Sequence, residues 1–203
     1  MTRRSAGTAV ALGCLLVSAF WGCRSPEPSE HLSEPIIHIG SNAQDPRLME
    51  TAILVVIRAP FETVRPYVAD PANIAGYLAF VTSSKAEPLA GAADGVLRVS
   101  LRMSVADVLG VSISGMPMGL DWRPVQSTDS VYAVSFERVE GAYEHMSGNI
   151  YVADLFDGST AAMLRMSSRS GFVPEGVREP LARFHAEESL KKLAALLEAN
   201  ASS

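Results

Sequence analysis

Alternation of apolar and polar residues dominates the middle of the chain and predicts a set of antiparallel strands. The clearest segment is 96–105, in which Leu97, Val99, Leu101, Met103 and Val105 alternate with Arg98, Ser100, Arg102 and Ser104. A period of two is typical of a strand that buries one face and exposes the other. Less regular patterns predict further strands over 111–123, 132–136, 144–156 and 160–168, and a β-branched run predicts a buried strand over 52–58.

Two short helices are predicted directly after the strand at 52–58. Pro60 suits the first turn of a helix over 61–69, and Pro66 is expected to end or kink this helix early. Asp70 is a suitable N-cap for a second short helix, with Pro71 at its first position.

A long helix is predicted over 174–199, where apolar residues recur at helical spacing. They are Val177, Leu181, Phe184, Leu190, Leu193, Ala194 and Leu197. This spacing places them near one face of a helix. Pro180 predicts a kink or a later start.

The first 22 residues have the pattern of an export signal. Arg3 and Arg4 are followed by apolar or small residues over 6–20. At ~1.5 Å per residue this stretch is short for the ~30 Å hydrocarbon core of a bilayer, so a signal peptide over 1–22 is predicted. It ends at Gly22-Cys23, which resembles a bacterial lipoprotein signal, although Phe20 and Trp21 depart from the usual residues.

The resemblance implies that Cys23 is acylated and holds the protein at a membrane. Arg24 follows it, and not the Asp that marks inner-membrane retention in many lipoproteins, so the periplasmic side of an outer membrane is expected. The alternatives are a soluble periplasmic or secreted protein and an uncleaved anchor. Residues 23–49, rich in Pro and Ser near their start, are expected to form a flexible tether, in which Ile36, Ile37 and Ile39 could add a short edge strand.

Length and charge limit the possible functions of the remaining chain. The protein has 203 residues, a length suited to one domain plus an extension, and 48% of them are apolar. The formal net charge is −5, and the first 22 residues contain two arginines and no acidic residue. The rest is therefore more acidic still and has no basic surface for phosphate backbones, so no nucleic-acid partner is expected.

The order of elements and three short motifs resemble the START-like (SRPBCC, helix-grip) superfamily, which includes polyketide cyclase/dehydrase and coenzyme Q-binding START families. The motifs are Ala59-Pro60 between strand and helix, Asp70-Pro71-Ala72-Asn73 at the second helix, and Asp157-Gly158-Ser159-Thr160 before the last strand. The resemblance covers residues 50–200. It implies an α+β fold in which a curved antiparallel sheet of about seven strands wraps around the C-terminal helix.

The same resemblance implies an apolar cavity between the sheet and the long helix. Seven residues are predicted to bind a hydrophobic ligand there: Leu101, Met103, Met118, Phe136, Leu181, Phe184 and His185. The flexible methionines 103, 116, 118, 146, 163 and 166 would adapt such a cavity to varied ligands. Ordinary core packing is the alternative for each of them.

Motifs for catalysis, metals and nucleotide cofactors are not found in the sequence. Residues 50–200 contain two histidines and no cysteine, and the chain has no Walker loop, Gly-x-Gly-x-x-Gly or Gly-x-Ser-x-Gly motif. No cofactor or metal is therefore expected. Two functions remain: a module that binds a lipid, quinone or polyketide-like molecule, and a cyclase, aromatase or dehydratase using His185 with Tyr132 or Tyr151 as proton carriers. The sequence does not determine the oligomeric state.

Overall fold

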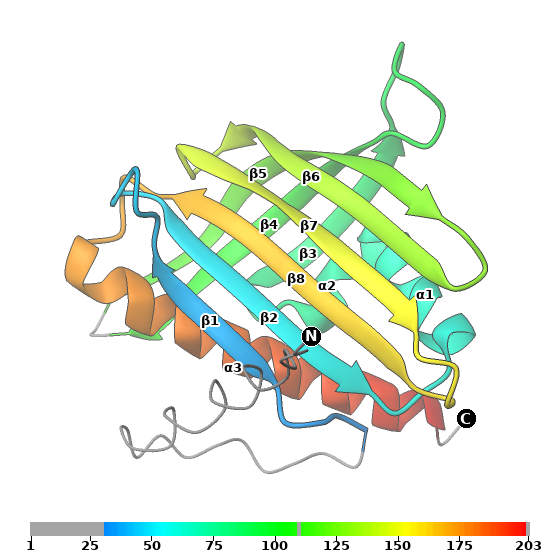
Figure 1. Cartoon of the computed structure of the whole chain (residues 1–203). Coiled ribbons are helices and arrows are strands. Elements are labelled where there is room, and N and C mark those ends of the chain that lie inside the picture. Colours follow the sequence, from blue (N-terminus) through cyan, green and yellow to red (C-terminus); the bar gives the residue numbers. More distant parts are fainter. Residues whose placement is uncertain (1–30, 109–110, 202–203) are drawn as a thin grey trace, which may run out of the picture.

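An eight-stranded antiparallel sheet and a long C-terminal helix form the body of the protein in this computed structural model, which describes residues 31–108 and 111–201 (Figure 1). The strand order is β1-β2-β8-β7-β6-β5-β4-β3. The strands are β1 Ile36–Ser41, β2 Met49–Ile57, β3 Val81–Pro88, β4 Leu97–Val108, β5 Val111–Ser127, β6 Val131–Gly141, β7 His145–Asp154 and β8 Thr160–Arg169. This arrangement confirms the predicted α+β class, with one antiparallel sheet packed on a long C-terminal helix.

The helices also lie where the sequence predicts them. They are α1 Phe61–Ala69, the short 3-10 helix η1 Pro71–Asn73, α2 Ile74–Tyr77 and α3 Glu175–Ala201. The side chain of Asp70 accepts a hydrogen bond from the backbone N–H of Ala72 at 2.9 Å, as an N-cap does. Pro66 does not end α1 early, because burial of Phe61, Val64 and Val68 holds the helix together across the lost hydrogen bond. Likewise, α3 continues through Pro180.

The edge strand considered possible within the expected tether is present in the structure. Residues 36–41, within the expected tether, form edge strand β1, which pairs with β2 and raises the number of strands from about seven to eight. Leu32 is buried and forms a bridge with Ile57. The alternating Ile37 and Ile39 turn inward, which is why this short segment pairs with the sheet. Residues 1–22 and Cys23 lie outside the described residues.

Two of the short motifs meet at one end of the sheet. The hydroxyl of Thr160, at the start of β8, donates a hydrogen bond to the carbonyl of Ala59 at 2.7 Å. Thr160 is fully buried, so this bond satisfies its hydroxyl and fixes the connection between β2 and α1.

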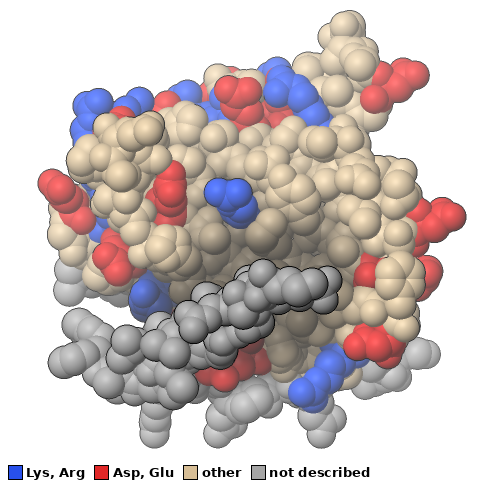
Figure 2. Space-filling model, in the orientation of Figure 1, with Lys and Arg blue, Asp and Glu red and all other residues tan. Residues whose placement is uncertain are grey.

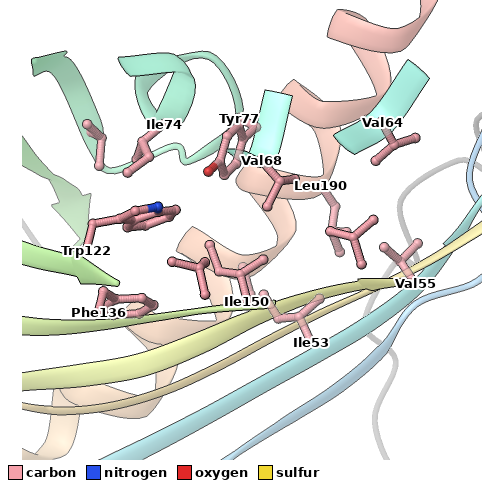
Figure 3. Close-up of a cluster of buried hydrophobic side chains, with 14 of the residues drawn as sticks. Ile53, Val55, Val64, Val68, Ile74, Tyr77, Trp122, Phe136, Ile150 and Leu190 are labelled. Atoms are coloured by element: carbon pink, nitrogen blue, oxygen red, sulfur yellow. The ribbon is translucent and has the colours of Figure 1, made fainter. Parts of the chain in front are cut away.

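One row of residues crosses the inner face of the sheet and shapes the space under α3. The register aligns Trp122, Phe136, Gly148, Met166, Thr51 and Ile39 on six neighbouring strands. Gly148 leaves room for the Phe136 ring, since a Cβ at Gly148 would overlap that ring and the carbonyl oxygen of Arg165. Figure 3 shows Trp122, Phe136 and Ile150 on the sheet side of the core, opposite Tyr77 and Leu190.

The outer face of the sheet is polar near its charged network. Asp121 is buried and pairs with Arg98 at 2.9 Å and with Arg123 at 2.7 Å, and Arg123 also lies 3.5 Å from Glu137. In the view of Figure 2, most charged side chains lie near the margin of the molecule and the central area is largely uncharged. Among the described residues, no helix is both long and apolar enough to span a membrane.

Candidate functional site

Three adjoining cavities lie between the inner face of the sheet and the helices. Cavity 1, of about 70 Å³, lies under the N-terminal half of α3, and cavity 2, of about 90 Å³, lies under its C-terminal half. Cavity 3, of about 20 Å³, lies between α2 and the sheet. Leu78 and Leu164 line all three, so these two side chains divide what is otherwise one apolar space.

Cavity 1 is apolar over most of its surface, with a minority of polar groups. Its apolar part comes from β2, β7, β8, α3 and the segment after α2, including Met49, Ile53, Phe80, Met146, Met166, Leu181, Ala182 and Ala186. Its side chains with polar atoms are Thr51, Tyr143, Ser168, Ser170, Arg178, His185 and Ser189. Such a lining suits a largely hydrophobic ligand with a small polar part.

Ser189 fixes the position of the segment that divides the cavities. Its hydroxyl accepts a hydrogen bond from the backbone N–H of Ala79 at 3.0 Å and donates one to the carbonyl of His185 at 2.7 Å. The side chain of Lys192 lies 3.5 Å from the carbonyl oxygen of Leu78. The backbone beside Leu78 and Phe80 is therefore tied to α3.

His185 faces the cavity as an uncharged imidazole. Its ring makes edge contacts with Phe80 and Phe184, at centroid distances of 5.5 and 5.8 Å. Burial among these groups lowers the pKa of His185 to about 4, because the charged form loses hydration. Its Nδ1 atom is buried and has no hydrogen-bond partner. Cavity 1 therefore offers a neutral imidazole able to bond to a ligand.

Thr51 and Arg178 complete the polar part of cavity 1. The Thr51 hydroxyl is buried without a hydrogen-bond partner. Arg178 is half-buried, and its Nε donates to the carbonyl of Val173 at 3.1 Å. The turn that presents Val173 is held by Ser170, whose hydroxyl accepts from the N–H groups of Phe172 and Val173.

Cavity 2 is almost wholly aliphatic. Its lining includes Val55, Ile57, Val64, Val68, Ala162, Leu190, Leu193 and Leu197. The hydroxyl of Tyr77 is buried there without a partner, and burial raises the pKa of this phenol. An unpaired buried hydroxyl costs roughly 1–3 kcal/mol, so a bound hydrogen-bonding group would stabilise this part of the core.

The structure divides the sequence-predicted ligand residues into three sets. Leu181 and His185 line cavity 1, while Leu101, Met118 and Phe136 line cavity 3. Met103 is fully buried in the sheet core and lines none of the three cavities. Phe184 is 40% exposed, because the inward face of α3 passes through His185 one residue later. The structure therefore places Met103 and Phe184 outside the three cavities, in contrast to the prediction that they line the ligand site.

Five residues of the site were not predicted from the sequence: Thr51, Leu78, Phe80, Leu164 and Arg178. Thr51 gave a usable signal, since it is a polar residue next to the apolar run at 52–57. Arg178, Leu181, Ala182, His185, Ala186 and Ser189 all lie on the cavity face of α3. These residues recur at helical spacing, but the small and polar ones among them do not show up in a pattern based on hydrophobicity.

The two tyrosines proposed as proton carriers do not line the cavities. Tyr151, one proposed proton carrier, is 37% exposed, and Tyr132 is buried but lines none of the three cavities. Within residues 31–108 and 111–201, no three His, Cys, Asp or Glu side chains are arranged to hold a metal ion. Arg165 lines a separate, solvent-open groove of about 560 Å³ on the outer face of the sheet.

Comparison with solved structures identifies the fold. No protein-family model and no curated protein matches the sequence. A STAR-related lipid transfer protein from Xanthomonas axonopodis is similar with a TM-score of 0.64 and 16% identity, over 85% of this chain and 97% of that one. A START superfamily protein from Mycobacterium smegmatis gives a TM-score of 0.54 and 17% identity, over 74% and 95% of the two chains.

A third similar structure is the di-domain ARO/CYC StfQ from the steffimycin biosynthetic pathway. Its TM-score is 0.51 at 8% identity, and the match covers 77% of this chain and 53% of that one. Together these similarities show that the described domain has the START/SRPBCC helix-grip fold. At these identities they show the fold alone.

Proposed function

We propose that this protein is an exported, lipid-anchored domain that binds a hydrophobic small molecule between its sheet and α3. The observation that carries the proposal is the apolar space under α3, which Leu181 and Leu193 line without filling. Well-packed cores leave few voids larger than a water molecule, whereas cavities 1 and 2 each hold several water-sized positions at roughly 10–15 Å³ each. A lipid, a quinone or a polyketide-like compound fits such a lining.

The similar Xanthomonas structure is that of a STAR-related lipid transfer protein, which supports this proposal by analogy of fold. The direct test is extraction of the purified full chain with organic solvent, followed by mass spectrometry. We expect a reproducible apolar compound in stoichiometric amount. A chain that yields no such compound and binds no apolar fluorophore would contradict the proposal.

Substituting Ala182 by phenylalanine should block ligand binding by filling cavity 1. Ala182 is half-buried and lines this cavity, so the larger ring would occupy the space that a ligand needs. We expect the affinity for the fluorophore 1-N-phenylnaphthylamine to fall by about tenfold or more, which corresponds to ~1.4 kcal/mol. Fluorescence titration measures this change.

The matched control is Ala195→Phe, which places the same ring on an exposed position of α3. It should bind the fluorophore like the unsubstituted protein. Thermal unfolding of both variants checks that each is folded. Equal affinity of Ala182→Phe and Ala195→Phe would place the fluorophore elsewhere and count against the cavity as the binding site.

Replacing Cys23 by serine should remove the proposed membrane anchor. Only a thiol at this position can receive the first acyl chain, and each buried CH2 of such a chain contributes ~0.8 kcal/mol to membrane binding. In a bacterial host, the full chain should incorporate radiolabelled palmitate and sediment with membranes, whereas Cys23→Ser should do neither. Cys14→Ser is the control and should remain labelled. Incorporation of palmitate into Cys23→Ser would contradict the proposed acylation of Cys23.

Catalysis in the same cavity is a second candidate function. The unpartnered Thr51 hydroxyl and His185 Nδ1 both belong to cavity 1, so two polar groups converge there as a cyclase, aromatase or dehydratase would need. Binding is favoured because a pKa of about 4 makes His185 a weak base at neutral pH. Chromatography coupled to mass spectrometry of a bound ketone before and after incubation separates the two functions. A cyclase would convert the ketone to an isomer with a different retention time, a dehydratase would also remove the mass of one water, and a binding protein would return the ketone unchanged.

A further inference from the structure

We propose that the ligand is a single-chain amphiphile whose anionic head, a carboxylate or a phosphate, is bound by Arg178 in cavity 1. This inference rests on the proposed binding of a hydrophobic molecule and specifies its chemical class.

The lining of cavity 1 contains one cationic side chain, Arg178, and no Asp or Glu. The charged lining of cavity 1 is therefore positive, although the chain as a whole has 22 acidic and 17 basic residues. A half-buried cation without a local counter-ion attracts an anion, and the apolar surroundings strengthen that attraction relative to water.

Arg178 is oriented but forms no ion pair within the described residues. Its Nε is held by the carbonyl of Val173 at 3.1 Å, which leaves the terminal nitrogens for a ligand. Glu179, its neighbour in sequence, lies instead 4.0 Å from Arg183. The planar guanidinium can donate two parallel hydrogen bonds to a carboxylate or phosphate.

The deeper polar groups of cavity 1 suit the same kind of head. Thr51 and His185 present a hydroxyl and a neutral imidazole, neither of which adds a negative charge. Both can therefore bond to an anion without repelling it. Six residues of α3 that line the cavity lie on one face, so Arg178 and His185 approach the same space from one helix.

The hydrocarbon chain of the ligand has a place in the adjoining space. Ile53, Leu78 and Leu164 line both cavity 1 and cavity 2. Most other side chains that line cavity 2 are aliphatic, and the exceptions include Tyr67, Tyr77 and Ser189. A chain that enters from cavity 1 therefore passes between Leu78 and Leu164 into surroundings without charge. The small volumes of these cavities favour a chain of medium length.

The test compares three ligands with the same chain: decanoate, decyl phosphate and decanol. Each is titrated against the purified full chain loaded with 1-N-phenylnaphthylamine, at a pH where decanoate is ionised. The variants are Arg178→Met, which removes the charge, and Arg178→Lys, which keeps it. Arg183→Met, on the exposed side of the same helix, is the control.

Arg178→Met should weaken binding of the anionic ligands by about tenfold or more, the size expected for a charge-assisted hydrogen bond. Its affinity for decanol should stay within about twofold, while Arg178→Lys should retain part of the preference for anions. Arg183→Met should change none of these affinities. Tighter binding of decanoate than decyl phosphate identifies a carboxylate head, and the reverse order identifies a phosphate.

Two results would overturn the inference while leaving the proposed function intact. One is equal affinity of the unsubstituted protein for decanol and for both anions. The other is an Arg178→Met variant that binds the anions as tightly as before. Failure of decanol and the fluorophore to bind at all would instead contradict the proposed function itself.

Discussion

Replacing Trp122 by alanine should lower the free energy of unfolding by about 3–5 kcal/mol, the range for removal of a buried aromatic side chain. Trp122 is 1% exposed and stacks on Phe136, with ring centroids 6.1 Å apart and planes 16° apart. It also lines cavity 3, so its removal would enlarge a space that the surrounding sheet already fails to fill. Urea unfolding followed by circular dichroism measures the change.

Two further measurements test whether the loss of stability in Trp122→Ala comes from the enlarged cavity and not from a general disruption of the fold. Trp122→Phe retains most of the apolar contact and removes an indole N–H that has no partner, so it should cost less than half as much. Added indole should restore part of the stability of Trp122→Ala, because an apolar cavity of suitable shape binds a small aromatic molecule. A loss below about 1 kcal/mol in Trp122→Ala would show that the core there is loosely packed.

Acidification should destabilise the protein through His185. Burial lowers the pKa of His185 in the folded state from 6.5 to about 4, so between these values the unfolded chain binds the proton more readily. The resulting stabilisation is fully present above pH 6.5 and is lost as the pH falls toward about 4. The loss should be about 2 kcal/mol, after allowance for the half-buried position of the ring.

This contribution can be isolated by comparison with His185→Leu. Carboxyl groups also reduce stability in acid, since contacts with Arg47 and Ser159 lower the pKa values of Asp45 and Asp157. Urea unfolding at several pH values in this window should therefore show a steeper decline for the unsubstituted protein than for His185→Leu. His145→Gln, altered at a histidine outside the three cavities, should decline like the unsubstituted protein. If the stability of His185→Leu declined with pH in parallel with that of the unsubstituted protein, His185 would not be the source of the pH dependence.

Most of the fold could be predicted because each element has a local signal of its own. The alternation over 96–105 fixed both the strand β4 and its inward face, and Val99, Leu101 and Met103 are buried as expected. Asp70 and Pro71 marked a helix start that the N-cap hydrogen bond confirms. By contrast, β1 is short and follows a Pro-rich segment, so its pairing with β2 depended on contacts that local sequence does not record.

The site could be predicted only in part. It depends on which face of α3 points toward the sheet and on small side chains that leave space unfilled. Hydrophobicity favoured Phe184 as an inward residue, yet the face of α3 that lines cavity 1 continues through Ala182, Ala186 and Ser189. Small residues make the space, and their effect depends on neighbours from other strands. The dividing role of Leu78 and Leu164 likewise follows from long-range packing between the segment after α2 and strand β8.

The burial of Leu32 has a consequence for how far the domain could move from a bilayer. If Cys23 carries the lipid, only residues 24–31 lie between the anchor and the buried Leu32. At ~3.6 Å per residue, the nine steps from Cys23 to Leu32 span at most about 32 Å when the segment is fully extended. A domain anchored in this way would stay close to its own membrane, so it could exchange ligand with that surface but would not carry it to a distant one.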